Sequence, residues 1–363
     1  MIKLQDRKTA KKVISFILVL ALVGTGVLGS MASISIQPSE DKSKAAVNYL
    51  VDNFDFMKEN RLQRMGDLVS LVGKEETSED YYKLAATQIA SEKYTDALTS
   101  IDQCIAMYGD KKDGRYLDLI MKKGCLYIMT GDYKNALKYI DEALRIDPNW
   151  ADAHLIKAQI FAETGNQPQL IASLESYMKL RPNDTEIRKL LAQAKFTSAD
   201  YGNAITEYEK ILEKKPDPQI SYLYGLTAIQ LGKYAEAEEN LTKAIGKDDT
   251  YDGIYYYRGV CRMSNNNYEG AVSDFTKSIE KASMTQASYY TRGVCSLMLE
   301  KYDYDAVKKD LQTASQGTDK EVAAQAKDLL QKLKTADEEA IKAAEEAAKH
   351  PNASTEEAIY AKP

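Results

Sequence analysis

The sequence has few of the residues from which metal sites and nucleophilic sites are built. Its 363 residues include two histidines, His154 and His350, and four cysteines, none of them in a Cys-x-x-Cys arrangement. A zinc site, a Ser-His-Asp site or a Cys-His site needs more of these side chains. There is also no phosphate-binding glycine loop, dinucleotide fingerprint or His-Glu-x-x-His motif. The sequence therefore predicts no enzyme activity, no metal and no cofactor.

Basic residues are also not in excess. The net charge is −6, and residues 1–12 carry +4 of their own, which leaves −10 for the rest of the chain. A nucleic-acid partner needs a basic surface to displace counterions. We therefore expect no nucleic acid among the partners.

Charge is absent from a 20-residue stretch at 13–32, which is long enough to cross a bilayer as a helix. The basic leader at 1–12 places the N-terminus in the cytoplasm by the positive-inside bias. We expect a single-pass signal-anchor helix with the body outside the cytoplasm. The alternative is a signal peptide cleaved after Ala32, because Ser30, Met31 and Ala32 resemble a cleavage site and give a secreted protein.

Two markers recur at the same intervals along the body of the chain. A small residue appears seven times, at intervals of 39, 34, 34, 33, 34 and 34: Ala85, Gly124, Ala158, Ala192, Gly225, Gly259 and Gly293. A second marker has the same six intervals: Tyr94, Tyr133, Gln167, Tyr201, Tyr234, Tyr268 and Tyr302. A five-residue insertion at about 112–116 separates the first two copies. Shared intervals indicate an internal repeat over 78–319, with copies at 78–111, 117–150, 151–184, 185–217, 218–251, 252–285 and 286–319.

The second copy shows the unit most clearly. Its markers are Gly124, Tyr127, Gly131, Tyr133, Ala136, Ile140, Ala143 and Pro148. This pattern resembles the tetratricopeptide repeat (TPR) family, whose unit of 34 residues is a helix–turn–helix. The resemblance implies an all-α fold, a right-handed solenoid, in which the first helices of the units line a concave groove that receives peptides.

The flanks of the array are predicted to be a linker at 33–44, one or two capping helices at 45–77, a capping helix at 320–350 and a flexible tail at 351–363. The N-terminal cap rests on apolar residues at helical spacing: Val47, Leu50, Val51, Phe54, Met57, Leu62, Met65, Leu68, Val69 and Val72. Terminal caps with a polar outer face are what a stack of repeats needs for solubility.

The predicted peptide-binding groove consists of residues three before, one after and four after each small residue, which share one face of a helix. The residues predicted to line it are Tyr82, Met121, Leu155, Lys189, Phe196, Tyr222, Leu226, Ile229, Tyr256, Val260, Met263, Tyr290, Val294 and Leu297. Tyr222, Tyr256 and Tyr290 form an aligned row, and tyrosine is enriched at interaction hot spots. The alternative is that part of this stripe is helix-to-helix packing.

Disulfides are permitted outside the cytoplasm, and Cys104 and Cys125 face adjacent helices, which makes them a candidate pair. Cys261 and Cys295 stand at equivalent points of neighbouring first helices, about 8–10 Å apart, which is too far for a bridge. The alternative for all four is a buried thiol.

Together these observations predict a non-enzymatic scaffold that is tethered to the membrane on the extracytoplasmic side and binds a partner protein or peptide in its groove. The alternatives are a secreted adaptor and a non-catalytic subunit of an envelope assembly or secretion complex.

Overall fold

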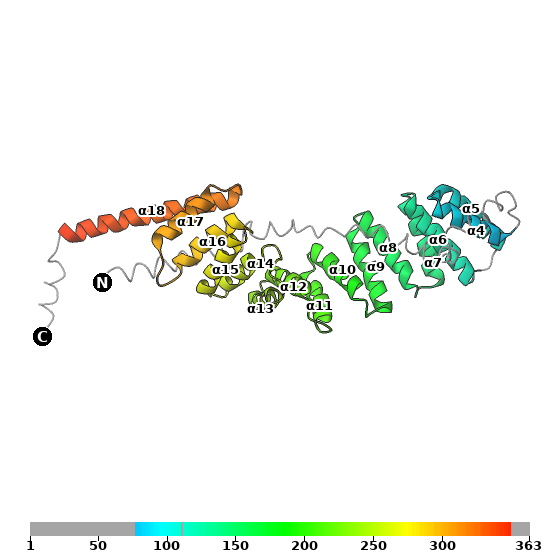
Figure 1. Cartoon of the computed structure of the whole chain (residues 1–363), viewed down its shortest axis with the longest axis horizontal. Helices are drawn as coiled ribbons and strands as arrows, with labels where there is room; N and C mark the ends of the chain where they lie inside the picture. The colour runs from blue at the N-terminus through cyan, green and yellow to red at the C-terminus, as the bar shows by residue number, and fades with distance from the viewer. Residues whose placement is uncertain (1–76, 110–111, 350–363) are drawn as a thin grey trace, which may run out of the picture. The chain divides into compact units, whose positions relative to one another are not determined.

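The computed structural model describes residues 77–109 and 112–349, with side chains as far as residue 339. Within these residues every element is a helix, and there are fifteen of them, α4 to α18 (Figure 1). The predicted all-α fold class is therefore confirmed. The predictions made for residues 1–76 and 351–363, including the membrane segment, fall outside the described residues. Among the helices that are described, none is both long and apolar enough to cross a membrane.

Fourteen helices form seven helix–turn–helix pairs, one for each predicted copy. The first helices are α4 (Ser78–Ala90), α6 (Gly114–Met129), α8 (Ala151–Glu163), α10 (Thr185–Thr197), α12 (Pro218–Gln230), α14 (Ile254–Ser264) and α16 (Thr285–Leu297). The second helices are α5 (Tyr94–Tyr108), α7 (Tyr133–Ile146), α9 (Gln167–Leu180), α11 (Tyr201–Leu212), α13 (Tyr234–Ile245), α15 (Tyr268–Glu280) and α17 (Tyr304–Ser315). One long helix, α18 (Lys320–Lys349), follows the seventh pair.

The described residues divide into two compact units, one ending at Lys214 and the other beginning at Lys215. In the N-terminal unit, α4 to α11, α5 packs on α6, α7 on α8 and α9 on α10. In the C-terminal unit, α12 to α18, α13 packs on α14, α15 on α16 and α17 on α18. A second helix that is followed by another helix of its own unit therefore buries part of its apolar surface against that helix, which a single copy of the repeat cannot do.

The turn inside each of the first six pairs contains one residue with positive φ, two positions before the second helix. In three pairs the residue is a glycine, namely Gly131, Gly165 or Gly232. In the other three pairs it is Glu92, Ala199 or Asn266, with φ of 59°, 58° and 62°. The left-handed conformation ends the first helix and reverses the chain within a few residues. A residue with a Cβ atom pays about 1–2 kcal/mol for it, which is why glycine suits this position.

The seventh turn is longer, which corrects the marker at Tyr302. α17 begins at Tyr304, and Asp303 caps it by accepting from the backbone N–H groups of Asp305 and Ala306. Gly293 faces Leu311, 18 positions later, whereas Gly259 faces Phe275, 16 positions later. This turn therefore has two extra residues, and none of residues 298–303 has a positive φ.

The small residue on each first helix lets the paired helices approach closely. A Cβ atom added to Gly225 would lie 2.6 Å from Cγ of Leu241, which is closer than such contacts ever are. One added to Gly293 would lie 3.3 Å from the side chain of Leu311, a distance that a shift of a few tenths of an ångström relieves. The partner side chain on the second helix thus decides whether alanine is tolerated at this position.

Replacing Gly225 with alanine should lower the free energy of unfolding by about 1–3 kcal/mol, because the new methyl group overlaps Leu241. Gly293→Ala is the matched control, and it should be neutral or stabilising, because the methyl group fits and alanine gains about 1 kcal/mol of helix propensity. Urea unfolding followed by circular dichroism measures both. Equal losses in the two variants would show that this contact does not set the helix spacing.

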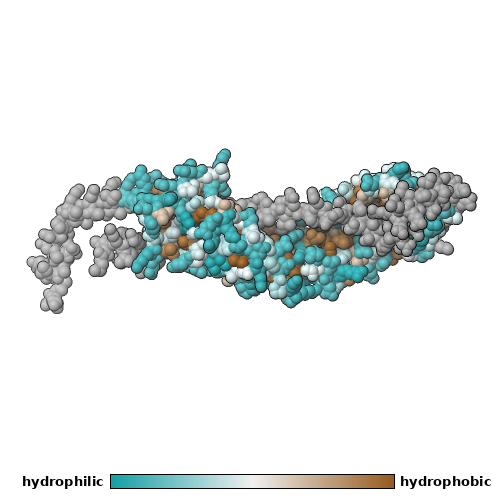
Figure 2. All heavy atoms as spheres, viewed as in Figure 1, coloured by the Kyte–Doolittle hydropathy of each residue, from teal (hydrophilic) through white to brown (hydrophobic). Residues whose placement is uncertain are grey.

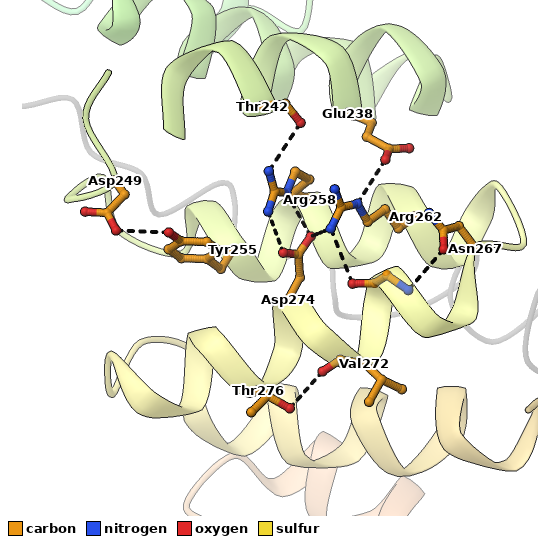
Figure 3. A network of polar contacts seen from close by, with 11 residues as sticks. Glu238, Thr242, Asp249, Tyr255, Arg258, Arg262, Asn267, Val272, Asp274 and Thr276 are labelled. Carbon is orange, nitrogen blue, oxygen red and sulfur yellow. Dashed lines mark hydrogen bonds and ion pairs between the residues drawn. The ribbon is translucent and has the colours of Figure 1, made fainter. Parts of the chain in front are cut away.

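In four of the seven pairs, the residue just before the small residue ties the pair to the pair before it. Arg258 donates to Asp274 of α15 at 2.9 and 2.7 Å and to Thr242 of α13 at 3.3 Å (Figure 3). Arg262 donates to the same carboxylate at 2.9 Å and to Glu238 of α13 at 2.9 Å. Asp274 is almost fully buried, so two guanidinium groups compensate for the burial of its charge.

The same position recurs in three other pairs. Arg292 donates to Asp310 of its own second helix at 2.8 and 2.7 Å and to Thr276 of the preceding one at 3.1 Å. Lys157 pairs with Asp141 of the preceding second helix at 2.7 Å. Lys123 pairs in the same way with Asp102 of α5. A cation at this position therefore joins two successive repeats.

Replacing Asp274 with asparagine should lower the free energy of unfolding by about 3–5 kcal/mol, because Arg258 and Arg262 lose the carboxylate that compensates for their burial. The control is Glu280→Gln, which removes an exposed partner of Lys277 and should leave stability unchanged. Guanidinium chloride unfolding of the two variants gives the comparison. A loss below about 1 kcal/mol for Asp274→Asn would contradict the role of this network.

α18 covers the end of the C-terminal unit. Four of its side chains are buried: Val322, Ala326, Leu329 and Leu333. They pack with Tyr290 and Val294 of α16 and with Leu311 of α17. Tyr304 and Lys308 of α17 donate to the carboxylate of Asp337 at 2.7 and 3.1 Å. The opposite side of α18, up to residue 339, is polar and exposed. This arrangement, apolar inward and polar outward, is typical of the last helix of a stack.

Candidate functional site on the first helices

We define the first-helix face as the residues three before, one after and four after the small residue on each first helix. These positions lie within about 60° of one another around the helix axis, so each helix presents one stripe. The fourteen residues predicted to bind a peptide all belong to this face. The structure buries nine of them and leaves five half-buried.

Tyr222 contacts the loop before α14. Its ring stacks on Tyr251, with 5.0 Å between the ring centroids and 11° between the planes. Its hydroxyl group donates to the backbone carbonyl of Asp252 at 2.7 Å. Burial raises the pKa of this hydroxyl group. Tyr222 therefore fastens the fifth pair to the sixth, and only 9% of it is exposed.

Tyr256 and Tyr290 are also part of the packing. The ring of Tyr256 lies 5.7 Å from that of Phe275 and 5.6 Å from that of Tyr257, centroid to centroid. Tyr290 belongs to the cluster that α18 covers, and burial raises the pKa of its hydroxyl group to about 12. The expectation of an exposed row of three tyrosines is therefore corrected, because these rings fill the space between consecutive pairs.

Six further residues predicted to line the groove are buried in the same way: Met121, Leu226, Ile229, Met263, Val294 and Leu297. The reason is that neighbouring first helices contact each other directly, as α6 does with α8 and α12 with α14, and that α18 contacts α16. Side chains at these positions consequently pack between two first helices. For these nine residues the structure supports helix-to-helix packing, which the sequence left open as the alternative.

The other five predicted residues are half-buried, and four of them lie in the N-terminal unit. They are Tyr82, Leu155, Lys189 and Phe196, with Val260 in the C-terminal unit. Phe196 meets Tyr201 edge to face, with 5.4 Å between centroids. Lys189 pairs with the exposed Glu186 at 3.3 Å. The N-terminal unit thus keeps aromatic, aliphatic and basic side chains with surface still accessible on this face.

Two cations lie against Tyr82, and the sequence analysis missed both. The guanidinium group of Arg115 lies 4.7 Å from the ring centroid of Tyr82, and its Nη2 contacts Glu79 at 2.6 Å. The ammonium group of Lys122 lies 5.3 Å from the same centroid and pairs with Asp118. Burial lowers the pKa of Lys122, and the charge of Asp118 opposes this shift. Lys122 is fully buried, whereas the side chain of Arg115 is 39% exposed and gives this end of the face a polar rim.

The five-residue insertion explains this rim. α6 begins at Gly114, three residues before the predicted start of its copy, and has 16 residues where most first helices have 13. Asp113 caps the added turn by accepting from the backbone N–H groups of Arg115 and Tyr116. The extra turn carries Arg115 to the side of α4. The sequence shows the insertion as the 39-residue interval, but it does not show that the insertion places Arg115 on this face.

The candidate disulfide is corrected as well, because Cys104 and Cys125 are free thiols. Sγ of Cys104 lies 3.1 Å from Oγ of Ser78 on α4, whereas Cys125 belongs to the first-helix face of α6. The two thiols therefore face different neighbours. Burial raises the pKa of both thiols, as expected for small side chains inside a packed core.

The described part of the chain contains no candidate metal-binding cluster. None of its residues forms a group of three or more His, Cys, Asp and Glu side chains that could hold a metal ion. Nε2 of His154 lies 3.0 Å from the carbonyl oxygen of Pro148, in the loop before its own helix. What this surface offers is therefore contact area, hydrogen bonds and charge.

Hydropathy does not single out one broad apolar surface. On the side of the molecule that Figure 2 shows, most described residues are hydrophilic and the hydrophobic ones come to the surface in separate patches. The large hydrophobic side chains that are most exposed are Met107 and Leu231, and neither belongs to the first-helix face. A binding site on this chain is consequently defined by the mixed character of its side chains.

Paired helices with a recurring spacing, each packed on the next, define a helical-repeat protein. Two models described as Tetratricopeptide repeat match residues 118–150 and 228–287. A model described as Anaphase-promoting complex, cyclosome, subunit 3 matches residues 164–244. The chain thus contains tetratricopeptide repeats, and repeats of this kind are typical of scaffolds for protein–protein interaction.

Two curated relatives cover part of the chain. The type IV pilus assembly protein PilF of Pseudomonas aeruginosa is 29% identical over 164 residues, which are 42% of this chain and 61% of PilF. The TPR repeat-containing protein YpiA of Bacillus subtilis is 22% identical over 145 residues, which are 39% of this chain and 34% of YpiA. The chain thus spans less than two thirds of either relative. A solved tetratricopeptide repeat protein from Parabacteroides merdae is 19% identical, with a TM-score of 0.41, over 70% of this chain and 97% of that one.

Proposed function

We propose that this chain is a non-enzymatic scaffold that binds an extended segment of a partner protein on the first-helix face of its N-terminal unit. The observation that carries the proposal is the half-buried set Tyr82, Leu155, Lys189 and Phe196 on α4, α8 and α10. A half-buried aromatic or aliphatic side chain is held in place by its own repeat and still has surface to bury against a ligand. The binding energy comes from the fit of the segment to the shape of this face and from contacts with these side chains.

The side chains of this face also indicate the chemistry of the partner segment. Leu155 and Phe196 favour apolar or aromatic side chains. Lys189 is 20% exposed and its partner Glu186 is 79% exposed, so replacing Glu186 by a carboxylate of the ligand costs little. We therefore expect an apolar segment that carries at least one acidic residue.

The proposed location rests on the sequence and on one relative. Residues 13–32 are uncharged and follow a basic leader, which supports a membrane tether with the repeats on the extracytoplasmic side. PilF is named a type IV pilus assembly protein, which favours a second candidate function, a non-catalytic subunit of an envelope assembly complex. The two candidates share the binding face and differ in what occupies it.

Binding is tested by selecting peptides from a random display library with the full-length chain and measuring their affinity by fluorescence anisotropy. Leu155→Ala combined with Phe196→Ala should weaken the selected peptides by about tenfold or more, because two buried contacts are lost. Lys189→Ala should weaken acidic peptides selectively. Thermal unfolding must show that each variant remains folded.

The matched control for this experiment is Met107→Ala combined with Leu231→Ala, which removes two exposed apolar side chains away from the face. It should leave the affinity unchanged. The proposal fails if the face variants are folded and bind as tightly as the wild type, or if the control variant loses binding equally.

The proposed location has its own test. In intact bacterial cells with a permeable outer envelope, an added protease should digest the repeats, and extraction should require detergent. Release without detergent, with an N-terminus at residue 33, would identify the secreted form. Protection of the repeats from the protease would place them in the cytoplasm and would contradict both forms.

A further inference from the structure

The fourth pair contains a buried hydroxyl group that lacks a hydrogen-bond partner. Tyr208 of α11 stands 16 positions after Ala192, the spacing at which Leu241 faces Gly225 in the fifth pair. The side chain is fully buried, and its hydroxyl oxygen makes no hydrogen bond to any described residue. The corresponding residue is apolar and buried in each of the other six pairs: Ile101, Ile140, Leu174, Leu241, Phe275 and Leu311. An unpaired buried hydroxyl group favours any state in which water reaches it.

The turn that leads into α11 also disfavours the closed pair. Ala199 has a φ of 58°, at the position where Gly131 and Gly232 lead into α7 and α13. Alanine has a Cβ atom that crowds this left-handed conformation, and it lacks the polar side chain with which Asn266 tolerates it in the sixth pair. Of the seven described pairs, the fourth alone combines such a turn residue with an unpaired buried hydroxyl group.

Part of the contact between α11 and α10 is formed by charged groups. Glu207 of α11 accepts from Nη1 of Arg188 at 2.5 Å and lies 3.6 Å from Nζ of Lys195, and all three residues are buried. Charged groups recover their hydration when a contact opens, so this part resists opening less than an apolar contact does. α11 is also the last helix of the N-terminal unit, whereas α5, α7 and α9 each pack on a first helix that follows them there.

We propose that the fourth pair opens locally: α11 leaves α10 while the pairs before it stay closed, and water reaches the hydroxyl group of Tyr208. Opening relieves both the unpaired hydroxyl group and the left-handed alanine. It also releases Phe196, whose ring meets that of Tyr201, the first residue of α11. A ligand that binds Phe196 in its closed position therefore favours the closed pair, a consequence that rests on the proposed function, although the opening itself does not.

Hydrogen exchange of the full-length chain, followed by mass spectrometry, tests the opening. After correction for intrinsic rates, the amides of α11 should exchange at least about tenfold faster than those of α7 and α13. Tyr208→Phe should slow the exchange of α11 by about fivefold or more and leave α7 and α13 unchanged, because the closed pair no longer buries an unpaired hydroxyl group.

Two controls match these changes. Tyr222→Phe removes a hydroxyl group that donates to the carbonyl oxygen of Asp252, so it should speed exchange in the fifth pair. Ala199→Gly should slow exchange in α11, whereas Asn266→Gly should have a smaller effect on α15, because asparagine tolerates the left-handed conformation.

The proposal is overturned if α11 of the wild type exchanges as slowly as α7, or if Tyr208→Phe leaves its exchange unchanged or speeds it. Equal slowing in every helix would indicate a global effect and would also overturn it. If one of the two α11 variants does not fold, the other variant and the wild type decide.

Discussion

Within each unit, the contact between a second helix and the first helix of the next pair is the interaction on which the rest of the structure depends. One helix pair has two apolar faces and can cover only one of them by itself. Covering the other requires a neighbouring pair, and the small residues on the first helices let the two helices within each pair approach closely. The intervals of 34 residues recur in the sequence because each repeat needs the same two helix lengths for this packing.

The charged residues follow from the same contact. Arg258 and Arg292 each bind a carboxylate of their own second helix and a hydroxyl group of the preceding one, so the hydrogen bonds cross the boundary between repeats. A buried carboxylate such as Asp274 is stable only where guanidinium groups are placed around it. The bonds that cross the boundary, from Arg258 to Thr242 and from Arg292 to Thr276, favour the neighbour whose hydroxyl group lies opposite the guanidinium group.

The contact also determines which side chains are left for function. In the C-terminal unit the first-helix face is occupied by contacts within the unit, from Tyr222 on Tyr251 to Tyr290 under α18. In the N-terminal unit the face keeps half-buried residues, and the added turn of α6 places Arg115 beside Tyr82. A single insertion in one repeat therefore makes one end of the array chemically different from the other without altering the fold.

The sequence by itself determined the all-α class, the period, and the first residue of six second helices, Tyr94 to Tyr268. These features depend on residues close in the chain, such as a left-handed turn residue two positions earlier and an apolar spacing of one helical turn. Tyr302 was misplaced because two inserted residues kept a tyrosine at the expected position. The tertiary structure alone decided which tyrosines are covered, where the insertion directs Arg115, and that Cys104 and Cys125 stay apart. Positions on one helix face contact either solvent or a neighbouring helix according to how closely the helices approach, and that distance depends on side chains far away in the sequence.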